Sequence, residues 1–236
     1  MVEAIPTYNG KEESVELYQQ YNFNSLNEAV ITAEIEEKLR EVKARHEAKQ
    51  PEAEITGNVI LNKLELSQLF ADLAYDLGYY RVYAKSNVHK KGDMIQKACT
   101  GDAITITMKG EAEGNIASAK FDADGMNLTD IKVIEEGKAI NYFGSNRFGQ
   151  YLGEKPTGNL GCMIVEPGTA CPKCLSKAPY LEVVSMSGLQ VDAYNDYIGG
   201  EVRLAYYNDG NTITPVTGIS ITGKLSEVLS SIRLAK

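Results

Sequence analysis

Residues 121–159 read FDADGMNLTDIKVIEEGKAINYFGSNRFGQYLGEKPTGN, and this stretch decides the fold class. Two runs with strand character, Ile131–Glu135 and Ala139–Phe143, lie on either side of Glu136-Gly137. A two-residue turn that contains glycine between such runs is typical of a tight β-hairpin, in which the two strands are antiparallel. We therefore expect antiparallel sheet in the middle of the chain.

Elements of both kinds are predicted outward from this hairpin. A second hairpin is expected where Val202–Tyr207 and Thr212–Val216 flank the turn-prone residues 208–211. The remaining predictions are strands at Asn58–Asn62 (buried), Tyr79–Tyr83 and Ala103–Met108, and short helices at about Arg147–Leu152, Pro172–Lys177 and Leu225–Arg233. Many strands with a few interspersed helices predict an α+β fold with a largely antiparallel β-sheet.

Two longer helices are predicted in the first third of the chain, after a strand that includes Val15 and Leu17. Ser25 and Glu28 have the spacing of a capping box, and the helix that follows is expected to end near Gln50, before Pro51. Its apolar stripe is Ile31, Ile35, Leu39 and Val42. We expect Ser67 to cap the second helix, Gln68–Leu77, whose apolar face is Leu69, Phe70, Leu73 and Leu77.

Composition excludes several classes of function. The 236 residues carry a net charge of −8, and no run of basic residues with interleaved aromatics is present, so nucleic-acid binding is not expected. No apolar stretch approaches the roughly 18–20 residues that cross a bilayer. The first residues lack the basic flank and apolar run of a secretory signal, so a cytoplasmic location with reduced thiols is expected.

Histidine is scarce, which limits the metal sites that the chain can build alone. His46 lies in a charged helical stretch and His89 in a polar loop, and both are predicted to be solvated surface residues. Their separation in sequence rules out a local ligand pair. We expect no histidine-based catalytic metal site formed by this chain alone.

The sequence CPKC at Cys171–Cys174 allows three interpretations. A Cys-x-x-Cys pair is typical of half a zinc site or of a redox pair. Zinc would need further ligands, for which Cys162 and Cys99 are candidates, and a redox motif should follow a strand and open a helix. Because Pro172 suits a first helical position, a structural or incidental role is favoured over metal, and metal over redox chemistry.

Asp122-Ala123-Asp124-Gly125 begins like a calcium loop, but the later ligand positions are missing. A turn, with Asp122 bonded to nearby backbone and Gly125 at positive φ, is the favoured interpretation. The chain also has no phosphate-binding glycine loop and no GxSxG nucleophile. Residue chemistry by itself thus predicts a soluble α+β domain that we do not expect to be catalytic alone.

An ordered series of segments resembles the TldD/PmbA family, once called modulators of DNA gyrase. The matching segments are Asp122–Gly125, Ile134–Gly137, Asn146–Gly153, Pro156–Asn159 (with Gly158) and Pro167–Thr169, followed by SGLQVD, YYNDGNTITPV and TGISITGKLSEVLSSI. The resemblance covers about residues 55–236. It implies that Asp122, Asp124, Gly125, Gly158 and Asn159 are family-motif positions, and that residues 1–54 are the remnant of a longer N-terminal domain.

TldD-type members of this family resemble zinc peptidases with an HExxxH helix, whereas PmbA-type members, also called TldE, lack it. The resemblance places Phe70 and Tyr75 at the two histidine positions and Ala71 at the glutamate position. These three are degenerate metal-helix positions. Phe and Tyr offer no imidazole, and Ala cannot act as a general base. The chain also ends at SIRLAK, without the cysteine ligand of the TldD-type tail. The similarity is therefore to the non-catalytic branch.

The resemblance implies a role in proteolysis or peptide maturation. We expect a non-catalytic subunit that binds an extended peptide by strand addition and pairs with a TldD-type metallopeptidase subunit. No catalytic residue, metal ligand or cofactor is expected in this chain, and zinc is expected only in the partner. The alternative is a stand-alone binding or scaffold domain, for which a homo-oligomer is the natural assembly. The resemblance also makes Cys171 and Cys174 local substitutions at a helix start.

Overall fold

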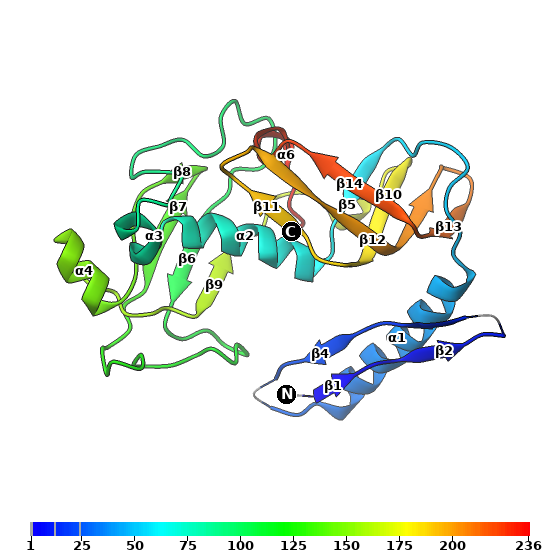
Figure 1. Cartoon of the computed structure of the whole chain (residues 1–236), viewed down its shortest axis with the longest axis horizontal. Coiled ribbons are helices and arrows are strands. Elements are labelled where there is room, and N and C mark those ends of the chain that lie inside the picture. The colour runs from blue at the N-terminus through cyan, green and yellow to red at the C-terminus, as the bar shows by residue number, and fades with distance from the viewer. Residues whose placement is uncertain (1, 12, 24) are drawn as a thin grey trace. The chain divides into compact units, whose positions relative to one another are not determined.

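The computed structural model describes residues 2–11, 13–23 and 25–236, which divide into two compact units. The first unit comprises Met1–Glu65, Ser176–Leu189 and Gly199–Thr222, and the second comprises Leu66–Leu175, Gln190–Ile198 and Gly223–Lys236. Helices and mainly antiparallel sheets occur together (Figure 1), so the expected α+β class is confirmed. Among the described residues, no helix is both long enough and apolar enough to cross a membrane.

A ribbon of short strands and one long helix form the N-terminal part of the first unit. Strand β1 (Val2–Ala4) pairs with β4 (Gln19–Tyr21), and β2 (Thr7–Asn9) pairs with β3 (Ser14–Glu16). The expected strand that includes Val15 and Leu17 is therefore two strands, with Leu17 between them donating its N–H to the Pro6 carbonyl at 3.1 Å. Leu17, Tyr21 and Val42 are buried in this part of the unit.

The long helix α1 (Glu28–Glu47) begins later than the capping box predicts. Asn27, not Ser25, is its N-cap, and the Asn27 side chain accepts the Val30 N–H at 3.2 Å. Asparagine and serine are equally good caps, so the choice between them depended on where the chain turns into the helix. The predicted apolar stripe is also only partly right, because Val42 is buried whereas Leu39 is 52% exposed.

The sheet of the first unit is built around β10 (Tyr180–Met186) and the long strand β12 (Tyr197–Asn208), which are antiparallel. Strands β13 (Ile213–Val216) and β14 (Ile219–Gly223) also pair with β12, and the turn between β12 and β13 confirms the second predicted hairpin. The core of this sheet is Leu181, Val183, Val202, Ala205 and Val216. Strand β5 (Asn58–Ile60) is an edge strand parallel to β10. It is not the buried strand expected, because Val59 is 45% exposed.

The second unit holds a sheet of order β8-β7-β6-β9 and most of the helices. Its strands are β6 (Ile106–Lys109), β7 (Ile131–Glu135), β8 (Lys138–Ala139) and β9 (Cys162–Val165). Strand β11 (Gln190–Asp192) also belongs to this unit and is hydrogen-bonded to β12, whose first two residues lie in the same unit. Its helices are α3 (Tyr79–Tyr83), α4 (Asn146–Leu152), α5 (Pro172–Leu175) and α6 (Leu225–Ser231), together with most of α2 (Lys63–Asp76). Glu136 and Gly137 have φ of 47° and 75° between β7 and β8, which confirms the first predicted hairpin turn.

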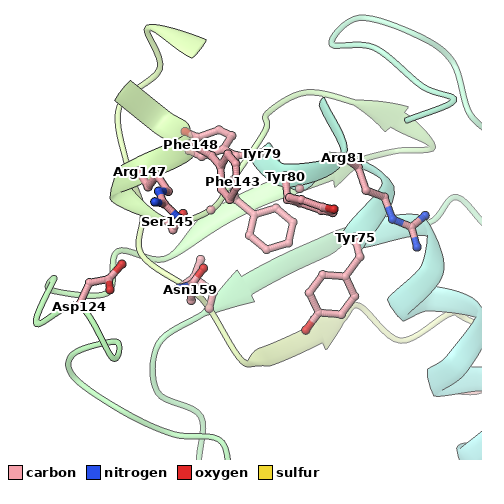
Figure 2. A pocket seen from close by; sticks show the side chains of 13 residues that line it. Tyr75, Tyr79, Tyr80, Arg81, Asp124, Phe143, Ser145, Arg147, Phe148 and Asn159 are labelled. Atoms are coloured by element: carbon pink, nitrogen blue, oxygen red, sulfur yellow. The ribbon is translucent and has the colours of Figure 1, made fainter. Parts of the chain in front are cut away.

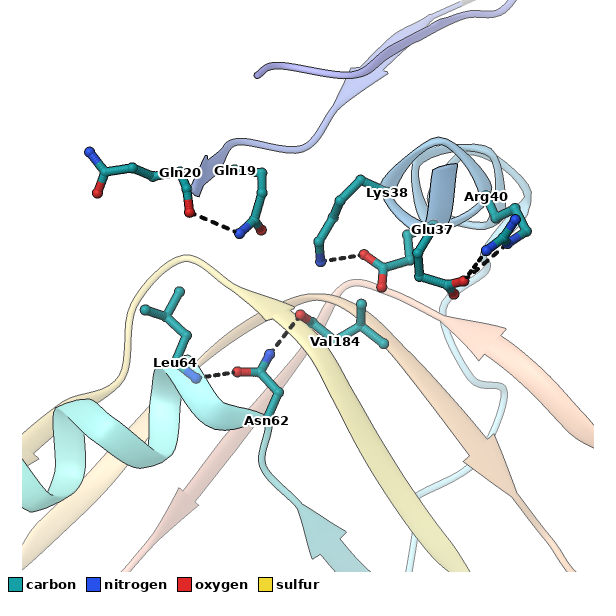
Figure 3. Close-up of polar contacts among 9 residues, drawn as sticks. Gln19, Gln20, Glu37, Lys38, Arg40, Asn62, Leu64 and Val184 are labelled. Carbon is teal, nitrogen blue, oxygen red and sulfur yellow. Dashed lines mark hydrogen bonds and ion pairs between the residues drawn. The ribbon is translucent and has the colours of Figure 1, made fainter. Parts of the chain in front are cut away.

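Helix α2 begins four residues before the predicted cap at Ser67. The Asn62 side chain accepts the Leu64 N–H and donates to the Val184 carbonyl, both at 2.8 Å (Figure 3). It also accepts the Glu65 N–H at 3.4 Å. This side chain therefore satisfies the first orphan amides of the helix and ties them to β10. The predicted apolar face of α2 is confirmed, because Leu69, Phe70, Leu73 and Leu77 are at most 3% exposed.

The strand predicted at Tyr79–Tyr83 is wrong, since these residues form helix α3. Helix α2 ends at Asp76, and Gly78 is the N-cap of α3, whose first turn begins where the Gly78 carbonyl accepts the Val82 N–H at 3.1 Å. The Tyr79 N–H donates to the Phe143 carbonyl at 2.7 Å, which fixes the start of α3 against a distant segment. Tyr79 and Tyr80, at the start of this helical turn, both line one pocket.

Candidate functional site

An open pocket of about 530 Å³ lies within the second unit, where α2 ends and α3 begins (Figure 2). Its lining comes from four separate segments of the chain: Tyr75 with Gly78–Arg81, Asp124, residues 143–148, and Asn159 with Leu160. Five of the lining residues are aromatic: Tyr75, Tyr79, Tyr80, Phe143 and Phe148. The pocket is the strongest candidate for a functional site because it combines an apolar interior with a few polar groups at its edge.

The floor of the pocket is made by Tyr79 and Phe143, which are 2% and 3% exposed. The Tyr79 hydroxyl donates to the Lys155 carbonyl at 2.7 Å, and burial raises the pKa of Tyr79, with a smaller contribution from the Glu154 carboxylate. Gly144 has a φ of 152°, and a Cβ at this position would lie 2.9 Å from the Tyr79 Cβ and 3.0 Å from its ring. Glycine is therefore required here, both for its backbone conformation and for the close approach of the ring.

One side of the pocket, lined by Tyr80 and Phe148, belongs to a cluster of tilted and edge-to-face rings from α3 and α4. We call this cluster the aromatic wall: Tyr80, Tyr83, Phe148 and Tyr151. Phe148 is central, with its ring centroid 5.4 Å from those of Tyr80 and Tyr83 and 6.1 Å from that of Tyr151. Tyr80, Tyr83 and Tyr151 are 65%, 50% and 59% exposed, respectively. Exposed aromatic rings held in mutual contact give a rigid apolar surface, which is typical of binding sites for peptides and proteins.

The charged groups at the pocket are Arg81, Arg147 and Asp124. Arg147 lies on the side of Ser145, whereas Arg81 lies beyond Tyr75 and Tyr80 (Figure 2). Within the described part of the chain, neither arginine forms an ion pair. The pocket therefore has two guanidinium groups and one carboxylate in its lining, on a chain with a net charge of −8.

Two of the family-motif segments meet beside the pocket. One carboxylate oxygen of Asp122 accepts the N–H groups of Asp124 and Met126, both at 3.0 Å, and the other accepts the Asn159 N–H at 3.1 Å. Partial burial raises the pKa of Asp122, but these three N–H donors outweigh it and leave the pKa below its usual value. The preferred interpretation of Asp122–Gly125 as a turn is confirmed, and the same carboxylate also joins this turn to Asn159.

The backbone conformations of Gly125 and Gly158 explain why glycine occupies these positions. Gly125 and Gly158 have φ of 75° and 79°, in the left-handed region that glycine adopts without strain. A Cβ at Gly158 would also overlap the Leu128 side chain. The structure thus brings Asp122, Gly125 and Gly158 together as support, while Asp124 and Asn159 reach the pocket itself.

The degenerate metal-helix positions separate in space. Phe70 is 3% exposed and contributes to the core, Ala71 is half-buried, and Tyr75 is 44% exposed and lines the pocket, with its ring 6.0 Å from that of Phe143. These side chains do not fit a zinc ion, because none of them supplies a ligand. Among residues 2–11, 13–23 and 25–236, no three His, Cys, Asp or Glu side chains are grouped as a metal site would require.

Neither histidine is the solvated surface residue that was predicted. The His46 ring stacks on Tyr8, with ring centroids 4.6 Å apart, because the strand ribbon packs over the end of α1. The His89 Nδ1 lies 2.9 Å from the Asp76 carboxylate, which is 2% exposed and also accepts the backbone N–H groups of Val88 and His89. The loop that looked polar in sequence is therefore held to the C-terminal end of α2.

The cysteines differ in their surroundings. Cys162 is buried, with its sulfur 3.7 Å from the Gly110 carbonyl, whereas Cys99, Cys171 and Cys174 are exposed. Cys171 immediately precedes α5 and Cys174 lies within it.

Sequence reasoning did not find the pocket. Its aromatic wall was divided between a predicted strand and a short helix, and Phe143 was assigned to a hairpin. The available signal was the density of aromatic residues in Tyr79–Tyr83 and near Phe148, combined with arginines in an acidic chain. That signal could indicate a binding surface, but not that its two halves are adjacent.

Comparison with protein-family models matches residues 54–236 to the PmbA/TldA metallopeptidase C-terminal domain. A search of curated proteins gave no match. Among solved structures, TldE from Thermococcus kodakarensis is similar with a TM-score of 0.73 and 14% identity, covering 95% of this chain and 54% of that one. A putative modulator of DNA gyrase from Bacteroides thetaiotaomicron gives 0.68 and 15%, covering 95% and 52%.

A putative modulator of a DNA gyrase from Thermotoga maritima is also similar, with a TM-score of 0.61 and 15% identity, covering 81% of this chain and 47% of that one. The chain thus spans about half the length of the solved structures that it matches. At these levels of sequence identity, the structural similarity shows a shared fold and nothing further.

Proposed function

The chain belongs to the PmbA/TldA metallopeptidase family through its C-terminal domain, and from this premise we propose that it is a PmbA- or TldE-like peptide-binding subunit of a TldD-type metallopeptidase assembly. In this proposal the chain holds an extended peptide in its second unit for proteolysis or maturation. Zinc and the catalytic groups belong to the TldD-type partner. The observation that carries the proposal is the position of the aromatic pocket beside the start of an edge strand.

The edge strand is β9, which pairs on one side with β6 and is last in the sheet order. Asn159 and Leu160 line the pocket, and the chain enters β9 two residues later, at Cys162. Ile164 on this strand is 39% exposed. A peptide that added to the free edge of β9 would continue toward the pocket, where main-chain hydrogen bonds give affinity and a side-chain pocket gives selectivity.

The identities of the helix residues support the division of labour between two subunits. Phe70 is part of the core, and Tyr75 presents a phenol to the pocket where a catalytic member of the family would present an imidazole. A phenol and a phenyl ring bind apolar groups well but bind zinc poorly. The residues of α2 therefore suit peptide contact better than metal chemistry.

Strand addition is tested with a fluorescently labelled extended peptide of alternating apolar and polar residues, by anisotropy. N-methylation of the amides on one edge of the peptide removes the donors that would pair with β9 and should weaken binding at least tenfold, since each lost hydrogen bond is worth about 1 kcal/mol. The control peptide carries the same number of N-methyl groups on the opposite edge and should bind like the parent. Equal weakening by both peptides would contradict strand addition.

The pocket is tested with Tyr75→Ala, which removes a ring from it, and with Tyr75→Phe as the matched control. Tyr75→Ala should weaken peptide binding by about tenfold from lost apolar contact, and Tyr75→Phe should leave binding nearly unchanged. Retention of full affinity by Tyr75→Ala would place the peptide elsewhere on the molecule.

The assembly is tested by incubating unfolded peptide and zinc with this chain alone, with a TldD-type partner alone, and with both. Cleavage should require the partner and should be faster with both chains present. Cleavage by this chain alone when loaded with zinc would overturn the proposal. Failure to bind or stimulate any TldD-type partner, with peptide binding intact, would favour the alternative of a stand-alone binding or scaffold domain, whose self-association can be measured by sedimentation.

A further inference from the structure

The CPKC segment places two exposed thiols on one helical turn at the point where the chain leaves the second unit. The Cys171 carbonyl accepts the Cys174 N–H at 2.8 Å and the Leu175 N–H at 3.3 Å, which closes the first turn of α5. Residues three apart on such a turn lie on the same side, with about 5–6 Å between their Cβ atoms. A disulfide needs about 3.8 Å, so a small adjustment of this exposed turn suffices to form one.

The surroundings of the two sulfur atoms differ. The backbone N–H groups of Lys173 and Cys174 and the Cys174 thiol donate to the Cys171 sulfur, and these hydrogen bonds lower the pKa of Cys171. The Cys171 side chain is exposed. An exposed thiol that is stabilised as the thiolate by N–H donors, with a second thiol beside it, is the arrangement of an attacking cysteine and a resolving cysteine.

The residues before Cys171 are held in place by the C-terminus of the chain. The Ala170 carbonyl accepts the Lys236 N–H at 3.0 Å, and the Gly168 N–H donates to the Ala235 carbonyl at 3.1 Å. Ala170 and Ala235 also form an isolated parallel bridge. The backbone that leads into Cys171 is therefore fixed, and both thiols are exposed.

Zinc is the other established use of a Cys-x-x-Cys pair, and it needs two more ligands. Cys162, the third ligand considered from the sequence, is buried against the Gly110 carbonyl. Across the part of the chain that the structure describes, no group of three or more His, Cys, Asp and Glu side chains includes this pair. The local geometry therefore favours thiol chemistry between the two cysteines over metal binding.

We propose that Cys171 and Cys174 form a thiol–disulfide exchange site that reacts with disulfides of small thiols or of proteins. The Cys171 thiolate attacks one sulfur of the disulfide RSSR, forms a mixed disulfide and releases RS⁻, which takes up a proton. The Cys174 thiol then loses its proton and displaces the second RS⁻ from Cys171, leaving an intramolecular disulfide. Two protein thiols are oxidised and RSSR is reduced to two RSH, so the electrons balance. The reverse reaction reduces the site.

The test uses the full chain in mixtures of reduced and oxidised glutathione, followed by acid quenching, maleimide labelling and mass spectrometry of peptides. The expected result is a reversible loss of two hydrogens that maps to a Cys171–Cys174 disulfide. Cys174→Ser should instead trap a glutathione mixed disulfide on Cys171. Cys99→Ser is the matched control, because it removes another exposed thiol and should leave the exchange unchanged.

Alkylation gives a second readout that does not depend on glutathione. Cys171 should react with iodoacetamide at neutral pH about tenfold faster than Cys99, and the rate should level off at a lower pH, as expected for a thiolate-stabilised cysteine. Equal rates at Cys171 and Cys99, or oxidation that gives only intermolecular disulfides, would overturn the proposal. Stoichiometric zinc that resists a chelator and is lost in the Cys171→Ser/Cys174→Ser variant would also overturn it.

Discussion

The two ends of α2 each carry a buried carboxylate, and the pKa values of the two carboxylates are shifted in opposite directions. Glu65, near the start of the helix, is 5% exposed, and Asp76, at its end, is 2% exposed. The pKa of Glu65 is raised and the pKa of Asp76 is lowered. Burial alone therefore does not decide the charge of a carboxylate; whether the surrounding hydrogen bonds and charges outweigh the burial also matters.

The difference lies in how fully each carboxylate is paired. Burial is the largest effect on Glu65 and raises its pKa, and the opposing groups, which include its own N–H, the Met186 backbone and Asn62, do not offset it. One Glu65 oxygen, Oε2, has no hydrogen-bond partner. Burial is also the largest effect on Asp76, but the His89 ring and the N–H groups of Val88 and His89, all within 2.9 Å, together outweigh it.

The largest effect should come from removing the satisfied carboxylate. Asp76→Ala leaves two backbone N–H groups and the His89 ring without their acceptor, so the free energy of unfolding should fall by about 3 kcal/mol. Urea denaturation followed by tyrosine fluorescence measures this change, since the chain has 14 tyrosines and no tryptophan. Asp72→Ala on the same helix is the control and should change stability by no more than about 0.5 kcal/mol. Equal losses in the two variants would remove the contrast.

The unfolding free energy should depend on pH in opposite directions for the carboxylates at the two ends of α2. The pKa of Asp76 is lowered in the folded state, so its stabilisation is present above its unfolded pKa of about 3.9 and is lost as pH falls through the folded pKa. The difference in unfolding free energy between the parent chain and Asp76→Ala should therefore shrink as pH falls below about 4. A difference that is constant from pH 7 to pH 2 would show that the charge of Asp76 is not involved.

Glu65→Gln should raise stability near neutral pH by about 1 kcal/mol, because it removes the cost of burying an incompletely paired charge. The folded pKa of Glu65 is raised, so the stability linked to its protonation is present below the unfolded pKa of about 4.3 and is lost as pH rises through the folded pKa. The advantage of the glutamine should thus vanish in acid. An advantage that persists unchanged at low pH would mean that packing, not charge, is responsible.

A smaller effect than that of Asp76→Ala is expected at the histidine. His89→Ala removes one of the three donors to Asp76 but keeps both backbone N–H groups, so the loss should be about 1 kcal/mol, less than that of Asp76→Ala. A double-mutant cycle of Asp76→Ala with His89→Ala measures their coupling. No coupling between the two would mean that the side-chain pair contributes nothing beyond the backbone contacts.

Whether the partners of a residue are near or distant in sequence explains which parts of the fold were predictable. The Glu136-Gly137 turn, the Asp122–Gly125 turn and the apolar face of α2 were found from sequence because each depends on residues within one or two turns of chain. The α+β class followed from these elements. The helix caps were predicted wrongly, because the capping residues are Asn27 and Asn62, not Ser25 and Ser67. Several residues of similar capping ability lie close together in the sequence, and local pattern does not choose among them.

The sequence by itself determined the fold class and the family resemblance, and the assignment of Phe70, Ala71 and Tyr75 to a degenerate metal helix stays a prediction. Only the tertiary structure decided that Tyr79–Tyr83 is a helix, that its rings meet those of α4, and that Asp76 holds the His89 loop. The physical reason is the same in each case. Phe143, Phe148 and His89 are distant in sequence from the groups that they contact, and no local pattern encodes a contact that forms only when the chain has folded.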